Sequence, residues 1–151
     1  MEYLVIGPGA MGIFSMLGYL KTMEDKLDNI KEYSGASAGA IICVMLALGF
    51  SIDEILYKFA LLDGNKIVKL NLKCFMNKYG LVDLKPIREQ FVNILESDLS
   101  FSDIDKKIYI SAFCVNTSKT VYFSKDTHPD MKVIDALCMS IAIPFIFSSY
   151  R

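Results

Sequence analysis

The chain has 151 residues, 53% of them apolar, which is enough for one domain with a substantial buried core. Its 16 basic and 17 acidic residues are scattered, so no basic run could follow a phosphate backbone, and we expect no nucleic-acid partner. One histidine and four separated cysteines predict reduced, buried thiols in a cytoplasmic protein, with neither a metal site nor a disulfide framework. These cysteines are Cys43, Cys74, Cys114 and Cys138.

The first elements are a strand and a helix. Residues 3–6, Tyr-Leu-Val-Ile, form an unbroken apolar run that predicts a central parallel strand covered on both faces. Glycines follow at once, which is unlike a secretory signal, and we expect the mature protein to begin near Met1. From Gly12 apolar residues recur at helical spacing to about Met23, and the charged residues 24–28 predict a loop.

A second strand and a buried helix are predicted next. Residues 30–34 supply the strand, and residues 38–48 form a helix that is apolar nearly all round and should therefore be buried. The longest apolar stretch, residues 36–50, is shorter than the roughly 18 to 20 residues needed to span a bilayer. We therefore expect no transmembrane segment, and any contact of the protein with a membrane would be peripheral.

Two further helices follow. Ser51 with Glu54 makes a capping-box pattern for a helix to about residue 62, and Asp-Gly-Asn at residues 63–65 is typical of a turn. Residues 84–95 predict an amphipathic helix, with a proline tolerated in its first turn.

The last third of the chain continues the α/β alternation. Residues 107–115 and 119–124 predict two strands joined by a short turn, and residues 133–140 a helix before Pro144. The sequence ends in an apolar segment, residues 143–151, where a further strand is expected to begin. We expect one domain over residues 1–151, incomplete at its C-terminus.

The residues Gly35-Ala36-Ser37-Ala38-Gly39 match the GxSxG pattern of a nucleophile elbow. They lie between the second predicted strand and the buried helix, where a sharp turn would make the Ser37 hydroxyl project from the fold. Gly35 and Gly39 would remove side chains that collide with neighbouring backbone. Ser37 is therefore the candidate nucleophile of a serine acyl hydrolase, although a helix start built from small residues also fits this pattern.

A glycine-rich loop, Gly7-Pro8-Gly9-Ala10-Met11-Gly12, stands between the first strand and the first helix. Its N–H groups would face the elbow and form an oxyanion hole if the two strands are neighbours. The same spacing is GxGxxG, and with Glu32 about 20 positions on it also fits a dinucleotide-binding fingerprint. A dinucleotide-binding domain leaves the Ser37 elbow unexplained, whereas an acyl hydrolase uses both motifs.

In this order the motifs resemble those of the patatin-like phospholipases, which have a glycine-rich loop, GxSxG some 30 positions later and an Ala-Ile-Pro segment downstream. Residues 140–147, Ser-Ile-Ala-Ile-Pro-Phe-Ile-Phe, look like that last segment, and residues 79–83 are similar to a stretch between elbow and hairpin. The resemblance covers nearly the whole chain. It implies a three-layer α/β fold, with a mostly parallel central sheet flanked by helices and the elbow between a strand and a buried helix, and no cofactor.

The resemblance also implies a serine–aspartate dyad that cleaves ester bonds of phospholipid or another lipid at a membrane or droplet surface. Ser37 would attack, and an aspartate in an Asp-Gly-Gly or Asp-Gly-Ala motif just beyond the Ala-Ile-Pro segment would be the base. The chain ends before such a motif. Asp63-Gly64 is its only Asp-Gly pair and is out of the family's order, while His128 beside Pro129 suggests a surface loop rather than a Ser-His-Asp triad.

The glycine loop departs from the family at two positions. Pro8 replaces a usual glycine and has no N–H to donate, and Met11 stands where a basic residue is frequent. The candidate oxyanion-hole residues are Gly7, Gly9, Ala10 and Ala38. Pro8 and the missing aspartate keep a catalytically inactive lipid-binding or regulatory module as an alternative.

Overall fold

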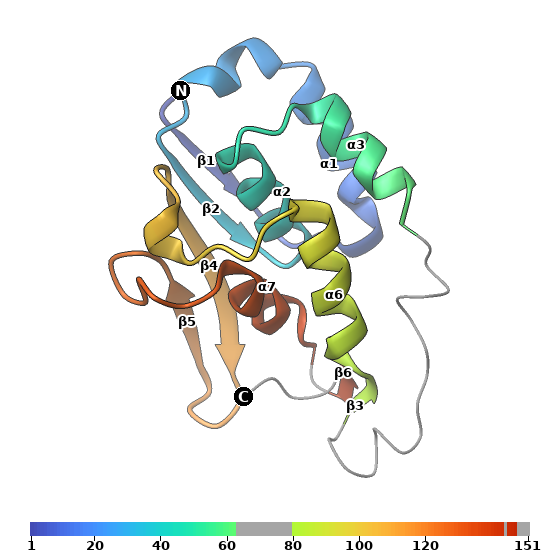
Figure 1. Ribbon diagram of the computed structural model, residues 1–151, viewed down its shortest axis with the longest axis vertical. Coiled ribbons are helices and arrows are strands. Elements are labelled where there is room, and N and C mark those ends of the chain that lie inside the picture. The colour runs from blue at the N-terminus through green and yellow to red at the C-terminus, as the bar shows by residue number, and fades with distance from the viewer. Residues whose placement is uncertain (63–79, 144, 148–151) are drawn as a thin grey trace.

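The computed structural model describes residues 1–62, 80–143 and 145–147 (Figure 1). Its main sheet has four strands in the order β1-β2-β4-β5, the first three parallel and β5 antiparallel to β4. A second sheet pairs β3 with β6 in parallel. The expected α/β fold with a mostly parallel sheet is confirmed. The strands are β1 Tyr3–Ile6, β2 Glu32–Ala36, β3 Gly80–Val82, β4 Lys107–Cys114, β5 Lys119–Phe123 and β6 Phe145–Phe147.

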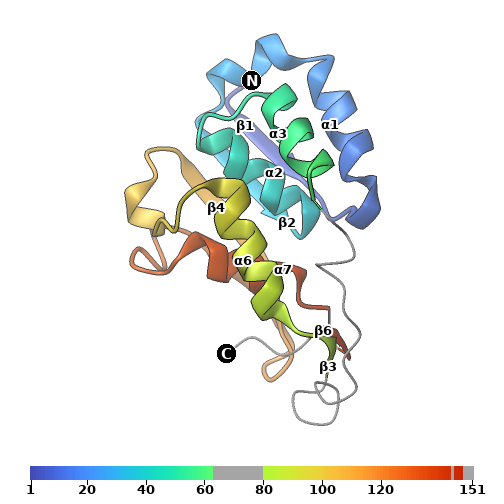
Figure 2. The ribbon, with the colours of Figure 1, turned by 45° about the vertical axis from the view of Figure 1, so that its right-hand side comes forward.

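The helices of the described chain gather on one face of the main sheet (Figures 1 and 2). Helix α2 packs against β1, β2 and β4, and α7 packs against β4. Helix α3 packs on α1 and α2, and α6 packs on α7. The α-helices are α1 Ile13–Lys21, α2 Ala38–Ala47, α3 Ile52–Ala60, α6 Leu84–Leu95 and α7 Val133–Ile141, and short 3-10 helices cover Ala10–Gly12 (η1), Glu24–Asn29 (η2) and Phe101–Asp103 (η3).

The strand order explains this one-sided arrangement. The chain steps from β1 to β2 to β4 in one direction, and right-handed crossovers in a single direction place their helices on the same face. On the opposite face Tyr3, Val5 and Phe113 are 62%, 77% and 60% exposed. The helices of the described residues thus cover one face of this sheet.

The prediction that residues 3–6 form a central strand is wrong for the described sheet. β1 stands at its edge, and its burial alternates, with Leu4 and Ile6 buried and Tyr3 and Val5 exposed. An apolar run shows only that each side chain can be buried. Whether both faces of the strand are covered depends on the rest of the fold.

Two other boundaries differ from expectation. β2 extends two residues beyond Ser34 because Gly35 and Ala36 still pair with the neighbouring strands, Gly35 with Ile6 and Ala36 with Ser111. Residues 24–28, expected as a loop, lie within η2, where Leu27 anchors the turn in the core with 8% of its surface exposed.

The remaining described elements lie close to their predicted positions. Helix α6 matches at both ends, and the strand expected near the end of the chain is β6. The capping box of α3 is confirmed, since the Ser51 N–H donates to Glu54 Oε2 at 2.7 Å and the Glu54 N–H donates to Ser51 Oγ at 3.3 Å. The predicted turn at residues 63–65 lies outside the described residues.

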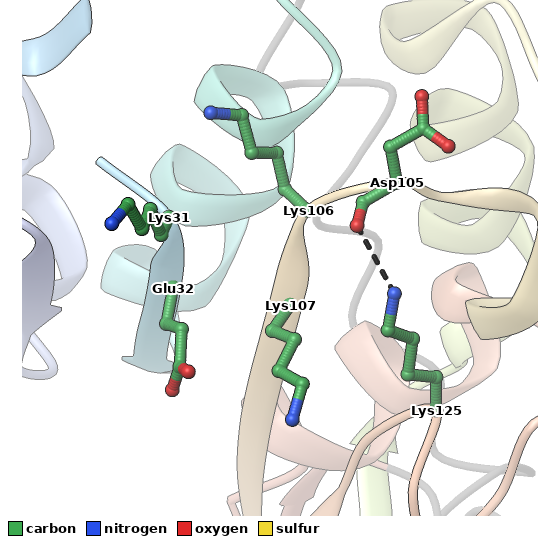
Figure 3. Close-up of a pocket in the computed structure, with 6 residues that line it drawn as sticks. All are labelled: Lys31, Glu32, Asp105, Lys106, Lys107 and Lys125. Atoms are coloured by element: carbon green, nitrogen blue, oxygen red, sulfur yellow. Dashed lines mark hydrogen bonds between the residues drawn. The ribbon is translucent and has the colours of Figure 1, made fainter. Parts of the chain in front are cut away.

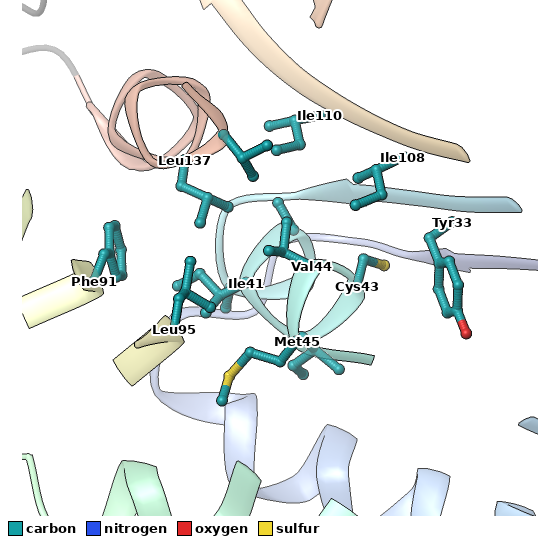
Figure 4. Packing of buried hydrophobic residues seen from close by; sticks show 14 of the residues in the cluster. Tyr33, Ile41, Cys43, Val44, Met45, Phe91, Leu95, Ile108, Ile110 and Leu137 are labelled. Carbon is teal, nitrogen blue, oxygen red and sulfur yellow. The ribbon is translucent and has the colours of Figure 1, made fainter. Parts of the chain in front are cut away.

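Helix α2 is the centre of the core (Figure 4). Its residues from Ala38 to Met45 are all buried, as the all-round apolar pattern predicts. Ile108 and Ile110 of β4 lie on one side of it and Leu95 of α6 on another (Figure 4). Burying one large aliphatic side chain contributes about 1.5–3 kcal/mol, so this packing firmly fixes the start of α2. No helix in the described ranges has the length and apolar character of a bilayer span.

Candidate active site

Ser37 is the single residue between the end of β2 and the start of α2. Its φ of 52° and ψ of −122° lie in a region that residues other than glycine seldom adopt. Strain of this kind costs on the order of 1–3 kcal/mol and persists only when the surrounding structure imposes it. Here the paired strand on one side and the buried helix on the other impose it, and Ser37 itself is half-buried.

Gly35 and Gly39 stand where backbone approaches too closely for a side chain. A Cβ atom at Gly39 would lie 2.3 Å from the Ile6 carbonyl oxygen and 2.5 Å from that of Gly7. A Cβ atom at Gly35 would lie 2.4 Å from the Ala40 Cα. The strand, the turn and the helix therefore meet in the way that the elbow pattern predicts.

The same close approach brings the glycine loop to the elbow. Because β1 and β2 are neighbours and Ile6 pairs with Gly35, the loop leaves the sheet beside the N-terminus of α2. Gly7 and Gly39 are in backbone contact there.

The conformation of the loop leaves N–H groups available. The Gly12 N–H donates to the Gly9 carbonyl at 2.7 Å and the Ile13 N–H to the Ala10 carbonyl, while Ala10 has a φ of 42°. In the part of the chain that the structure describes, the N–H groups of Gly9 and Ala10 have no hydrogen-bond acceptor. The Ala38 N–H, in the first turn of α2, has no acceptor within its helix either.

A base for Ser37 is not among the described contacts. Within residues 1–62, 80–143 and 145–147, no carboxylate or imidazole is hydrogen-bonded to the Ser37 hydroxyl. His128 is exposed, as expected, with its Nδ1 2.9 Å from Thr127 Oγ1. It follows the antiparallel strand β5 and so lies toward the amino ends of the parallel strands, away from the elbow. Asp63-Gly64 and Tyr79 lie outside the described residues.

A lysine-rich hollow of about 390 Å³ also lies at the amino ends of the strands (Figure 3). Its ammonium groups already have partners: Lys31 contacts Glu2 at 2.6 Å, and Lys125 donates to the Asp105 carbonyl at 3.0 Å. Lys106 likewise donates to the Ile30 carbonyl at 2.6 Å. Active sites of open α/β sheets lie at the carboxyl ends of the strands, so this hollow is separate from the candidate site.

The cysteines are less uniform than expected. Cys43 and Cys138 are buried free thiols, and burial raises the pKa of each to about 12. Cys114 is a free thiol but only half-buried, because β4 projects there into the hairpin, so the prediction of burial is wrong for this residue. Cys74 lies outside the described residues.

One residue of the site escaped sequence reasoning. Ser140 of α7 accepts a hydrogen bond from the Ser37 N–H at 2.8 Å and donates one to the Ser111 carbonyl at 2.6 Å. The sequence marks it only as the first residue of the segment that contains Ala-Ile-Pro. A separation of 103 positions from Ser37 hides the contact.

A strained serine between a parallel strand and a buried helix places this chain in the class of α/β proteins with an elbow of the nucleophile type. The family model of the patatin-like phospholipases matches residues 4–151, and the chain belongs to this family.

The chain is also similar to individual proteins in sequence or in fold. An uncharacterised protein of Acanthamoeba polyphaga mimivirus is 32% identical over 95% of this chain and 52% of its own length. The probable lipid hydrolase 463L of Invertebrate iridescent virus 6 is 29% identical over 98% of this chain and 55% of its own length. ExoU of Pseudomonas aeruginosa, in complex with SpcU, has a similar fold, with a TM-score of 0.65, 21% identity and coverage of 97% of this chain and 39% of that chain. The chain thus spans about half the length of the two viral relatives and less of ExoU.

Proposed function

We propose that this protein is a serine-dependent lipid acyl hydrolase of the phospholipase A or lipase type, with Ser37 as its nucleophile. The main observation in support of this proposal is the strained elbow, which holds a half-buried serine at the start of a buried helix. In this reaction Ser37 Oγ attacks the ester carbonyl carbon, the alcohol portion leaves with a proton, and water then hydrolyses the acyl-enzyme. Membership of the patatin-like phospholipase family supports this chemistry.

The oxyanion that forms during the attack needs backbone donors. We assign this role to the N–H of Ala38 and to those of the glycine loop, Gly9 and Ala10 above all, with Gly7 at its start. The N-terminus of α2 adds a partial positive charge that stabilises the same anion. Pro8 contributes nothing because it has no N–H.

The base is proposed to be an aspartate supplied from outside these 151 residues. In the family's order it follows the Ala-Ile-Pro segment, which is residues 142–144 here. This chain would then be a patatin-like acyl hydrolase domain that is incomplete at its C-terminus. Because an unassisted serine is a poor nucleophile near neutral pH, we expect little turnover from the 151 residues alone.

Contact with a lipid surface is proposed at the glycine loop. No residue between Glu2 and Lys21 is charged, and in this stretch Met11 and Phe14 are 86% and 47% exposed. An uncharged rim beside the elbow would let an acyl chain enter without burying an ion.

The lipid contact is tested with neutral phosphatidylcholine vesicles. Met11→Glu should reduce cosedimentation of the protein, because a carboxylate resists transfer into the lipid interface. Tyr3→Glu is the matched control, since Tyr3 is 62% exposed at the opposite end of β1. Equal loss in both variants would contradict a specific contact at the loop.

The hydrolase proposal is tested by Ser37→Ala in the protein expressed from its complete reading frame. Hydrolysis of fluorogenic phospholipid and triacylglycerol should fall by at least about 10³-fold, because the nucleophile is gone. Ser102→Ala, at an exposed serine of η3, should leave the rate unchanged. An unchanged rate in Ser37→Ala would refute the proposal.

The alternatives give different results. An inactive lipid-binding or regulatory module would bind vesicles but leave Ser37 unlabelled by a fluorophosphonate, which reacts only with an activated serine. A dinucleotide-binding domain would bind a nicotinamide or flavin nucleotide at the Gly7 to Gly12 loop. Absence of measurable affinity for both nucleotides excludes that domain.

A further inference from the structure

A serine hydroxyl on α7 connects the elbow to the neighbouring strand. The Ser37 N–H donates to Ser140 Oγ at 2.8 Å, and the Ser140 hydroxyl donates to the Ser111 carbonyl at 2.6 Å. These bonds link residues 103 and 29 positions apart in the sequence. The chain of two bonds therefore joins three elements, α2 at its N-cap, α7 and β4.

The Ser37 N–H needs a partner from outside its own segment. The strand pairing of β2 ends at Ala36, and Ser37 is the N-cap of α2 with a left-handed φ of 52°. In this conformation the N–H continues neither the ladder nor the helix. An unpaired N–H at a half-buried position would add to the cost of a turn that is already strained.

A serine side chain suits this position because its hydroxyl donates and accepts at the same time. The Ser111 carbonyl accepts a hydrogen bond from the Ser140 hydroxyl. An oxygen lone pair of Ser140 is therefore directed at the Ser37 N–H. Ser140 itself is held firmly, since Leu137 and Cys138 of the same helix are fully buried. At the other end of α7, Asp135 accepts from Arg88 Nε at 2.9 Å.

We propose that Ser140 is a positioning residue, which holds the strained Ser37 backbone so that its hydroxyl keeps one place relative to the oxyanion donors. This inference rests on the proposed acyl hydrolase function. It assigns to Ser140 a role in the rate of the chemical step, with no contact to the substrate. A displacement of the nucleophile by about 1 Å can cost on the order of 10²-fold in rate.

The hydrogen bond itself is tested without any activity, by amide hydrogen exchange of the 15N-labelled 151-residue chain. The Ser37 amide should exchange at least about 10-fold faster in Ser140→Ala than in the unaltered chain, because its acceptor is removed. Ser140→Thr keeps a hydroxyl and should retain protection. Ser97→Ala is the matched control, since Ser97 is also half-buried and its hydroxyl donates locally to the Leu95 carbonyl at 3.1 Å.

The functional role is tested by lipid hydrolysis with the protein from its complete reading frame. For Ser140→Ala we expect kcat to fall about 10²-fold with KM nearly unchanged, and for Ser140→Thr a partial recovery of kcat. Ser140→Cys, of nearly the same size but with a weak sulfur acceptor, should behave like alanine and remains informative if Ser140→Ala does not fold.

The outcomes separate the two proposals. If Ser37→Ala abolishes hydrolysis while Ser140→Ala and Ser140→Cys keep the original kcat, the positioning role is overturned and the hydrolase remains. If Ser37→Ala hydrolyses lipid at the original rate, the hydrolase proposal itself fails. Unchanged exchange of the Ser37 amide in Ser140→Ala and Ser140→Cys also overturns the positioning role, whatever the kinetics show.

Discussion

Replacement of Gly39 by alanine tests the physical basis of the elbow. The added Cβ atom would lie 2.3 Å from the Ile6 carbonyl oxygen, whereas ordinary contact begins at 3.4 Å, so α2 and β1 must separate by 3.4 − 2.3, about 1.1 Å. Overpacking costs about 1–3 kcal/mol, and the upper half of this range applies because the obstructing atoms are backbone and have no alternative rotamer. Alanine in a helix is more favourable than glycine by about 1 kcal/mol. The net loss in the free energy of unfolding is therefore about 1–2 kcal/mol.

The matched control is Gly18→Ala in α1. A Cβ atom at Gly18 meets nothing within 4 Å, so only the helix propensity changes and stability should rise by about 0.5–1 kcal/mol. In thermal unfolding followed by circular dichroism, these values correspond to a fall in Tm of about 2–8 °C for Gly39→Ala and a rise of about 1–4 °C for Gly18→Ala. A Gly39→Ala variant as stable as Gly18→Ala would refute the reasoning that backbone contact dictates this glycine.

Three further predictions concern local features. Ser51→Ala removes the N-cap of α3 and should lower the free energy of unfolding by about 1 kcal/mol in urea titrations, and an unchanged midpoint would contradict the cap. Donation from the Ser51 N–H and, second to it, from the Ser51 hydroxyl lowers the pKa of Glu54 from 4.5. The stabilising effect of the Glu54 carboxylate is therefore present above that pH and disappears as pH falls through the lowered value. In acid titration, Ser51→Ala should lose the hydroxyl's part of this effect and keep the part that comes from the backbone N–H. With iodoacetamide at pH 8, peptide mass spectrometry should show that Cys114 is modified before Cys43 and Cys138. Hydrogen bonds from Thr117 lower the pKa of Cys114, whereas burial raises the pKa of Cys43 and of Cys138. Equal rates of modification would argue against this order.

Much of the fold follows from local patterns. The amphipathic pattern of residues 84–95 locates α6 at both ends, and the all-round apolar character of α2 predicts its burial. Boundaries that depend on pairing were less predictable. β2 runs to Ala36 because β1 and β4 continue beside it. The residues of β2 themselves do not indicate how far these neighbouring strands extend.

The candidate site divides in the same way. Gly35, Ser37 and Gly39 follow from a five-residue pattern whose physical demands are local. Ser140 does not, because a single serine on an apolar helix carries no sign of an acceptor role across 103 positions. The dyad's aspartate, the oxyanion donors and the second helical layer stay predictions.

The sequence by itself determined the α/β class, the family and the elbow serine, because each depends on residue types at short spacing. Only the tertiary structure decided that β1 lies at the edge of the described sheet, that the glycine loop meets the elbow through Gly7 and Gly39, and that Ser140 receives the Ser37 N–H. These three depend on the order and register of strands and on helix packing, and such long-range relations leave no local pattern in the chain.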